Sequence, residues 1–198
     1  MTAVKVEDVF GSFPALETER LLLRKLTKDD AQDVFEYGSD PKVTKYVTWN
    51  THQSLKDTRE FMEFSLGKYE NKELAPWGME WKENGKLIGT IDFVSWDIRN
   101  RVGEIGYVLS RDYWGKGITT EAAKKVIEFG FEEMDLVRIQ ARCSTENVGS
   151  ERVMQKAGMS YEGIIRKGLF AKGKHHDLKL YSVLREEYDA EAEGERNE

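Results

Sequence analysis

Two glycines separated by one residue carry the first chemical signal in this 198-residue chain. Gly115 and Gly117 follow an apolar segment from Glu104 to Leu109 that predicts a buried strand, and a helical pattern begins directly after them. A glycine turn that opens a helix directs several backbone N–H groups and the positive end of the helix dipole at one point. A phosphate or diphosphate suits such a turn, and Thr119 or Thr120 is the predicted N-cap.

Two familiar phosphate-binding motifs do not fit this turn. A Walker loop has four residues between its first glycine and a Gly-Lys-Ser/Thr sequence, whereas here Lys116 alone separates the glycines. A dinucleotide-binding fingerprint requires a third glycine where Thr120 stands. For the turn considered by itself, a tight connection without a ligand remains the simpler alternative.

The turn resembles the acyl-CoA loop of the GNAT N-acetyltransferase superfamily, which is written Gln/Arg-x-x-Gly-x-Gly/Ala. The chain has Asp112-Tyr113-Trp114-Gly115-Lys116-Gly117, so Asp112 departs from the first position and no side-chain contact to the cofactor is expected there. The resemblance implies that backbone N–H groups bind the diphosphate of acetyl-CoA, which serves as co-substrate without a metal. The residues expected to bind it are Val108, Trp114, Gly115, Lys116, Gly117, Ile118, Thr119, Asn147 and Ser150.

A second block, from Asn147 to Met159, resembles the conserved Asn-x-x-Ala/Ser…Lys-x-Gly-Phe segment of the same superfamily. Asn147 is suited to cap the following helix, and in the family the matching Asn also contacts the pantetheine arm. Both roles stay open for Asn147. Gly158 is interpreted as the stop of that helix.

Within the superfamily, the segment Leu16-Glu-Thr-Glu-Arg-Leu-Leu-Leu-Arg, the Tyr-Trp-Gly-Lys-Gly turn and Asn-x-x-Ser are similar to the RimJ/RimL ribosomal-protein branch. That branch acetylates protein N-termini, and its relatives acetylate polyamines, amino sugars and other small amines. Three hypotheses follow. The chain acetylates a protein N-terminal amine, such as that of a ribosomal protein; or it acetylates a small-molecule amine, such as a polyamine, an antibiotic or an amino acid; or it is a catalytically silent acyl-CoA-binding module.

The implied reaction needs an uncharged amine, so a base must remove a proton from a group that titrates at about 8 (α-amine) or about 10.4 (lysine). Glu104 is the predicted base, because it aligns with the glutamate base of the histone-acetylating relatives. Glu80 and Glu162 are rivals, and a solvated glutamate at a strand edge is the plain structural alternative.

The other half of the reaction needs an oxyanion donor and an acid for the leaving thiolate. A backbone N–H at a bulged end of the strand, near Val108, is the predicted donor. Many relatives use a Tyr as acid where this chain has Met154, which leaves Ser150 as the predicted substitute, with a purely structural helix-facing hydroxyl as the alternative. Transfer is expected to be direct, since Cys143 lacks a paired His that would activate it.

Periodic apolar residues predict an α/β fold with one mixed sheet, in the order β-α-α-β-β-β-α-β-α-β-β, which is the GNAT order. Asn84-Gly85 predicts a hairpin between two central strands, and the helix crossover makes the strands around it parallel. Residues 1–188 are expected to form a single domain, and the acidic residues 189–198 to be disordered. Aromatic side chains expected to wall the acceptor pocket are Tyr46, Trp49, Trp96 and Tyr107.

Composition excludes several functional classes. The net charge of −6 argues against a general nucleic-acid binder. No apolar run approaches the roughly 20 residues of a membrane helix, and the first residues have no signal-peptide core, so a cytoplasmic location is expected. Adjacent His175 and His176 would point to opposite faces of a strand, and no metal site is predicted. The sequence leaves open whether the chain is a monomer or a homodimer.

Overall fold

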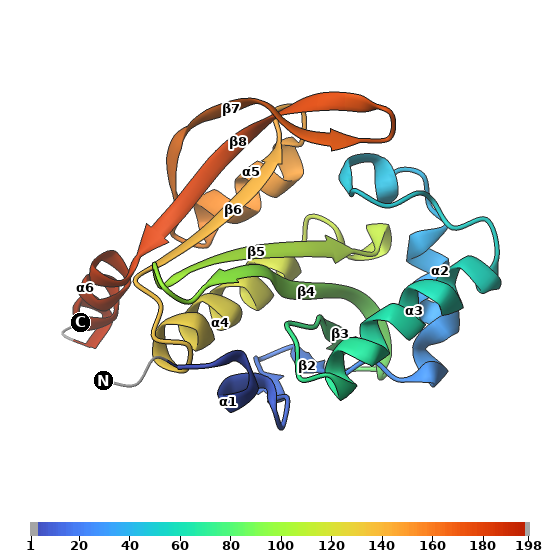
Figure 1. Cartoon of the computed structure of the whole chain (residues 1–198), viewed down its shortest axis with the longest axis horizontal. Coiled ribbons are helices and arrows are strands. Elements are labelled where there is room, and N and C mark those ends of the chain that lie inside the picture. The colour runs from blue at the N-terminus through green and yellow to red at the C-terminus, as the bar shows by residue number, and fades with distance from the viewer. Residues whose placement is uncertain (1–3, 197–198) are drawn as a thin grey trace.

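The computed structural model describes residues 4–196, and the described residues form one eight-stranded sheet flanked by helices (Figure 1). The strand order in the sheet is β1-β2-β3-β4-β5-β6-β8-β7. The strands are β1 (Leu16–Glu17), β2 (Leu21–Arg24), β3 (Trp77–Trp81), β4 (Lys86–Asp97), β5 (Val102–Leu109), β6 (Arg138–Ser144), β7 (Ser160–Ala171) and β8 (Lys174–Leu184). The α-helices are α1 (Val6–Phe10), α2 (Ala31–Gly38), α3 (Leu55–Glu70), α4 (Ile118–Glu132), α5 (Val148–Lys156) and α6 (Arg185–Arg196).

The predicted order of elements and the mixed sheet are confirmed. β5 and β6, on either side of the α4 crossover, are parallel, and the other neighbouring strands pair antiparallel. Beyond the prediction, the structure has α1, β1, α6 and three short 3₁₀ turns, among them η2 (Thr44–Tyr46). The acidic stretch from residue 189, which was expected to be disordered, is helical as far as Arg196. The prediction that the domain ends at residue 188 and that this stretch lies outside it stays a prediction.

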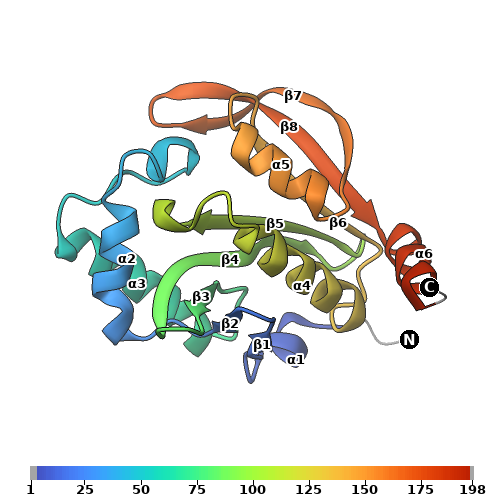
Figure 2. The ribbon, with the colours of Figure 1, turned by 180° about the vertical axis from the view of Figure 1, so that it is seen from behind.

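Helices cover the two faces of the sheet in different ways. α4 and α5 lie against one face, as the view from behind shows, and α2 and α3 lie on the other side (Figures 1 and 2). The apolar face of α4 is buried, and its members recur at helical spacing toward the sheet: Ala122, Ala123, Val126, Ile127 and Phe131. Close packing extends to the backbone, since a Cβ on Gly130 of α4 would lie 2.7 Å from the ring of Phe93.

The predicted hairpin between β3 and β4 is also confirmed. Gly85 has φ +71°, a left-handed conformation that a residue without Cβ adopts readily. The N–H groups of Asn84 and Gly85 both donate to the carbonyl of Trp81. The hairpin therefore fixes the register of two central strands locally, next to the strand that carries the site.

The strands β5 and β6 separate after a short parallel ladder. Only Val102, Gly103 and Glu104 of β5 pair with β6, although β5 continues to Leu109 and β6 to Ser144. The two strands diverge from this point in Figure 1. Backbone groups on that side of β5 beyond Glu104 thus have no neighbouring strand, which makes this edge of β5 accessible to another extended molecule.

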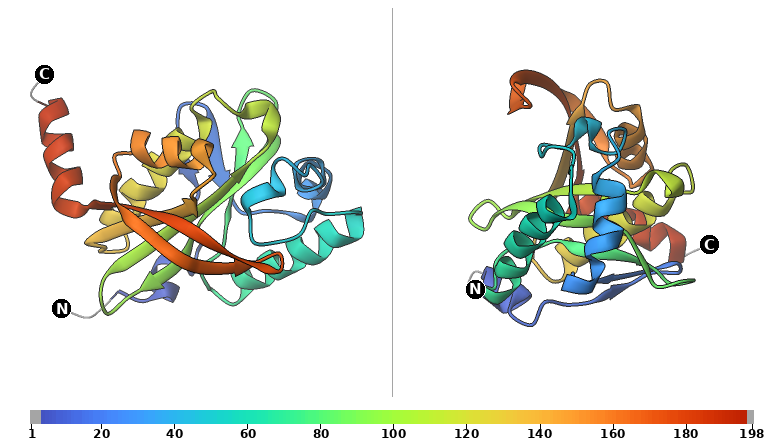
Figure 3. Two further views of the ribbon diagram at one scale, coloured as in Figure 1. Left: turned by 90° about the horizontal axis from the view of Figure 1, so that it is seen from above. Right: turned by 90° about the vertical axis from the view of Figure 1, so that its right-hand side faces the viewer.

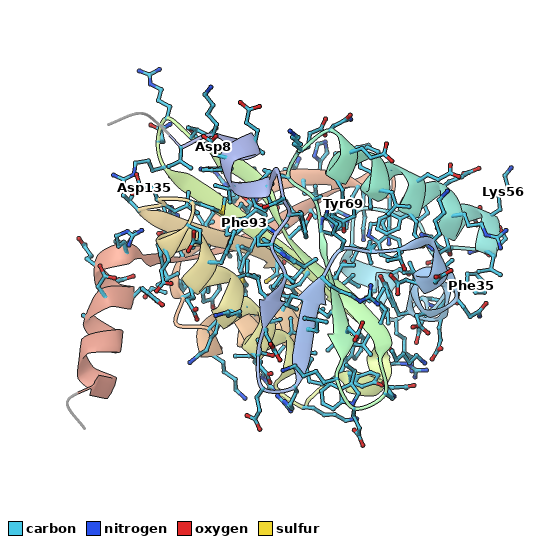
Figure 4. All side chains as sticks on the ribbon, turned by 90° about the horizontal axis from the view of Figure 1, so that it is seen from below. Asp8, Phe35, Lys56, Tyr69, Phe93 and Asp135 are labelled. Atoms are coloured by element: carbon cyan, nitrogen blue, oxygen red, sulfur yellow. The ribbon has the colours of Figure 1, made fainter. Side chains whose placement is uncertain are left out.

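The long β7–β8 hairpin reaches over toward the loop that contains η2 (Figure 3). Lys172 in the hairpin turn donates through Nζ to the carbonyl of Thr44, and Tyr46 Oη donates to the carbonyl of Glu146 at 3.2 Å. These contacts bring η2 beside the end of β6. By contrast, Lys56 near the start of α3 points outward, whereas Tyr69 near the end of the same helix lies within the body (Figure 4).

Candidate active site

The glycine turn before α4 forms an exposed backbone cradle. Gly115 and Gly117 both have φ +75°, and a Cβ placed on Gly115 would meet no atom within 4 Å. Gly117 is the N-cap of α4 and no side chain caps the helix, so the predicted caps Thr119 and Thr120 are wrong. A glycine in the left-handed conformation starts the helix instead, and the N–H groups of the first turn face outward. This arrangement fits the diphosphate of an acyl-CoA.

The side chains next to the two glycines turn away from the cradle. Lys116 Nζ donates to the carbonyl of Asp112 at 2.8 Å and lies over the ring of Tyr113. Trp114 is half-exposed, and its Nε1 donates to the carbonyl of Leu109 at 2.8 Å. The cradle is thus built from backbone, and the indole of Trp114 joins it to the end of β5.

A charged cluster from the β1–β2 turn supports the cradle from behind, and the sequence analysis missed it. Arg20 Nη1 donates to the carbonyl of Lys116 at 3.0 Å, and Arg20 Nε donates to Glu121 Oε2 at 2.7 Å. Glu121 also accepts from Thr18 Oγ1 at 2.6 Å. The segment Leu16–Arg24 had been interpreted as a branch signature and, from Arg20 on, as a strand, and pairing across about a hundred residues gives no local sequence signal.

The second block places Asn147 and Ser150 beside β5 on the face that carries α4 and α5. Asn147 is the N-cap of α5, since its side chain accepts from the Ser150 N–H at 3.1 Å. Tyr107 Oη lies 2.9 Å from Ser150 Oγ and donates to the Ser150 carbonyl at 3.2 Å. Tyr107 was predicted to wall the acceptor pocket. Its side chain lies instead on the face that carries α4 and α5, whereas the side chain of Glu104 points to the other face, because successive side chains of β5 alternate between the two faces.

The predicted oxyanion donor at Val108 needs correction. The register shift lies in β4 between Phe93 and Ser95, opposite the start of β5, and pairing is regular at Val108. The Ser110 N–H donates to the Ile88 carbonyl of β4. Because hydrogen-bonded pairs alternate along an antiparallel ladder, the N–H of Val108, two residues earlier, also points toward β4. The N–H groups directed at the divergence from β6 are therefore those of Tyr107 and Leu109.

Glu104 lies at the last paired position between β5 and β6 and is buried. One of its carboxylate oxygens accepts from Gln140 Nε2 at 2.9 Å, and the other accepts from Arg142 Nε at 2.8 Å. Its rivals are also engaged. Glu80 forms an ion pair with Arg24, and Glu162 forms one with Arg138. The pKa of Glu162 is about 2, because hydrogen bonds from Arg138 and Ser182 stabilise its charged form.

Asp92 in β4 is a titratable group that sequence reasoning missed. It pairs with Gly106 of β5, and its carboxylate is half-buried on the face that carries α3. Burial raises the pKa of Asp92 to about 6, against a smaller opposing effect of Lys68. The sequence signal was weak, since an aspartate within an apolar strand is informative only when its partners are known.

The four predicted wall aromatics do not come together. Tyr46 reaches the carbonyl of Glu146, so it lies between η2 and the β6–α5 connection. Trp49 packs on His52 and Phe61 with centroid distances of 5.0 and 5.9 Å. Trp96 packs near Phe10, 6.5 Å between centroids, because the bulge in β4 turns it to the other face of the sheet.

Cys143, His175 and His176 are engaged in packing or backbone contacts. Burial raises the pKa of the Cys143 thiol to about 11, so it stays protonated at neutral pH. His175 packs on Phe170, and a ring nitrogen of His176 lies 3.2 Å from the Ala171 carbonyl. Within the described residues, no three His, Cys, Asp or Glu side chains are grouped as a metal site would require.

No helix in the described part of the chain has the length and apolar character needed to cross a membrane.

Comparison with known proteins gives consistent matches over most of the chain. Residues 20–160 match the family described as Acetyltransferase (GNAT) domain. The "Uncharacterized N-acetyltransferase YoaA" of Bacillus subtilis is 34% identical, over 87% of this chain and 98% of that protein. The "Putative ribosomal N-acetyltransferase YdaF" of the same organism is 29% identical, over 90% of this chain and 99% of that protein. A crystal structure of a GNAT-family acetyltransferase from Bacillus anthracis superimposes with TM-score 0.77 and 34% identity, covering 87% and 99% of the two chains.

Proposed function

This chain belongs to the GNAT acetyltransferase family and is an N-acetyltransferase with acetyl-CoA as co-substrate, and we propose that its acceptor is the N-terminal α-amine of a protein. Acetyl-CoA supplies an activated acetyl thioester, and the residues of the chain bind it, orient it and move protons. The observation that supports the role of acetyl-CoA is the backbone cradle at Gly115 and Gly117, both at φ +75° at the start of α4.

We propose the following roles on the donor side. The N–H groups from Trp114 to Thr119, including those of Lys116 and Ile118, hold the diphosphate, because they lie where the positive end of α4 is exposed. The edge of β5 at Tyr107 and Leu109 pairs with the pantetheine arm and directs an N–H at the developing oxyanion. Ser150 Oγ, held by Tyr107, donates a proton toward the departing thiolate.

Support for a protein N-terminus comes from similarity and from the acceptor side of the fold. The match to the relative named as a putative ribosomal N-acetyltransferase covers 99% of that protein and 90% of this chain. Asp92 supplies negative charge on the face opposite α4, where Glu104 is already paired with Arg142, and this charge suits an incoming ammonium group. A ribosomal protein is the finer form of this proposal. A cytoplasmic location is proposed with it, since the single thiol is buried and reduced.

One experiment tests both parts. Calorimetry with acetyl-CoA measures binding, and mass spectrometry then localises the acetyl group on a hexapeptide that has a free N-terminus and one internal lysine. Acetylation of the α-amine alone is expected. The matched control is the same peptide with a blocked N-terminus, which should stay unmodified.

Other outcomes separate the alternatives. Rapid acetylation of spermidine with the peptide ignored would assign the chain to the small-amine enzymes. Absence of acetyl-CoA binding at millimolar concentration would contradict the role given to the glycine turn. Either result leaves the family unchanged and removes the proposed acceptor or the proposed cradle.

A further inference from the structure

We propose that Asp92, and not Glu104, takes the proton from the acceptor amine, and that Glu104 instead links β5 to β6 where the two strands part. This inference rests on the proposed function and adds to it the group that activates the acceptor. Four observations carry it: the place of Asp92 on the sheet, the absence of a side chain at Gly106, the lack of hydrogen-bond partners on Asp92 and the full use of Glu104.

Asp92 lies in the middle of β4 and on the acceptor side. It pairs with Gly106, two residues past the last β5 residue that pairs with β6, so it lies one strand away from the divergence. A Cβ built on Gly106 would come 3.6 Å from Asp92 Oδ1 and 2.8 Å from Val94 Cγ1. Because Gly106 has no side chain, the Val94 side chain and the Asp92 carboxylate share the space above it. In the proposal, an amine at this edge approaches Asp92 past Val94, directly or through one water.

The surroundings of Asp92 suit a group that gains and loses a proton. No group in the described part of the chain hydrogen-bonds to its carboxylate, in contrast to Glu104 on the same face. The charged and titratable groups around it are Lys68 and Tyr69 on α3 and, farther along the same face, Glu104 on β5 and Arg142 on β6. Desolvation raises the pKa of Asp92 to about 6, and Lys68 opposes this shift. Such a carboxylate is mostly ionised at pH 7 yet binds a proton readily, as a general base requires.

Glu104 has the opposite arrangement. Both of its oxygens accept from β6, one from Gln140 and one from Arg142, and the Arg142 contact is an ion pair at 2.8 Å. These bonds span the last β5–β6 pair, beyond which the ladder ends. Removing them for each proton transfer would leave the Arg142 guanidinium without its partner carboxylate. The arrangement therefore favours a positioning role for Glu104, in which it sets the point where β5 and β6 diverge.

The proton balance closes within the reaction. Asp92 takes one proton from the ammonium group, so an N–H bond breaks and an O–H bond forms. The nitrogen lone pair then bonds to the acetyl carbon, and the carbon–sulfur bond breaks. The second proton of the nitrogen passes by way of Ser150 Oγ to the departing thiolate. Asp92 finally releases its proton to water, and no further reactant is needed.

The test compares pH profiles of kcat/KM for wild type, Asp92→Asn and Glu104→Gln, using acetyl-CoA and the free-amine hexapeptide. Wild type is expected to lose activity below a pH of about 6, where Asp92 becomes protonated. Asp92→Asn should fall by about 100- to 1,000-fold at pH 7, and its acidic limb should move to the α-amine's own value of about 8. Glu104→Gln should keep the limb of about 6 whatever its overall rate. Asp97→Asn, an exposed change on the same strand, is the matched control.

The inference fails if Glu104→Gln loses the acidic limb and Asp92→Asn keeps it. Asp92→Ala provides a second route, because added formate can occupy the vacated space and should restore at least tenfold of the lost rate if a carboxylate acts there as base. No rescue, combined with an unchanged limb in Asp92→Asn, would also overturn it. Calorimetric binding of acetyl-CoA by each variant separates these results from loss of folding or failure of the cradle.

Discussion

The two faces of the sheet at the divergence of β5 and β6 are built differently. On the donor face, the site consists of consecutive backbone groups at a glycine turn and the first turns of α4 and α5, with Tyr107 hydrogen-bonded to the hydroxyl and the carbonyl of Ser150. On the acceptor face, it consists of single side chains from separate strands, Asp92 on β4 and Glu104 on β5. The first face depends mainly on local chain geometry, and the second needs the correct pairing of distant strands.

This difference suggests how the fold serves its chemistry. The acetyl donor is the same in every member of such a family, and backbone N–H groups at a helix start bind a diphosphate whatever the side chains are. The acceptor differs between members, and side chains on the other face can change without disturbing that cradle. Four predictions test this division.

The largest effect is expected for Ser150→Ala, which should lower kcat about 100-fold with little change in the KM for acetyl-CoA. The physical reason is that Ser150 Oγ is held by Tyr107 at 2.9 Å and supplies a proton only in the reaction. Tyr107→Phe should show a smaller loss, since Ser150 keeps its hydroxyl. Steady-state kinetics provides the measurement.

Ser160→Ala, at an exposed residue of β7, is the control for the loss of a serine hydroxyl. If Ser150→Ala raises the KM for acetyl-CoA and leaves kcat unchanged, Ser150 binds the co-substrate and does not act as acid. The donor face would then only bind the co-substrate, and the proton transfers would be assigned to the acceptor face alone.

The donor face could be predicted from the sequence to a large extent. Gly115 and Gly117 predict a left-handed turn before a helix, and Asn147, three residues before Ser150, predicts an N-cap. Each signal depends on neighbours within a few residues. Arg20 was missed on this face because its partner, Glu121, lies far away in the chain.

The acceptor face could not be predicted in the same way, and strand register is the reason. A bulge in β4 between Phe93 and Ser95 reverses the alternation of side chains, so Trp96 turns to the α1 side and away from the acceptor. Asp92 can be recognised as a candidate site residue only when the strand pairing places it opposite Gly106. A one-residue change in this register is invisible in the local pattern, yet it decides which side chains share a face.

The second prediction concerns the glycine cradle. Gly117→Ala should weaken acetyl-CoA binding by at least about tenfold, or about 1.4 kcal/mol, because a methyl group at φ +75° strains the turn and moves the N–H groups. Gly173→Ala is the matched control, since Gly173 has φ +78° in the β7–β8 turn with no atom within 4 Å of an added Cβ. Both variants should lose about 1–2 kcal/mol of stability. Equal effects on acetyl-CoA affinity in calorimetry would show that strain, and not the cradle, explains the loss.

The third prediction is the pH dependence of stability in Asp92→Asn. The folded-state pKa of Asp92, about 6, lies above its ordinary value of 3.8, so the folded protein binds more protons than the unfolded chain between these values. Stability contributed by this group is present at low pH and falls as pH rises through about 6. Asp92→Asn should therefore gain about 1–2 kcal/mol over wild type at pH 8 relative to pH 4. Denaturant unfolding at both pH values measures it, and a constant difference between the two would mean that Asp92 is solvated.

The smallest effect is expected for Arg20→Gln, which tests how far the cradle depends on a side chain. Arg20 contacts the Lys116 carbonyl and Glu121, and its Nη2 lies 3.8 Å from a Cβ built on Gly117. Since the pair is partly exposed, its removal should weaken acetyl-CoA binding by about threefold at low salt, and less at high salt. Lys82→Gln removes a cation that pairs with Glu17 and not with α4, and should change binding little. A loss above tenfold that resists salt would mean that Arg20 holds the turn in shape, and the donor face would then depend, like the acceptor face, on strand pairing far away in the sequence.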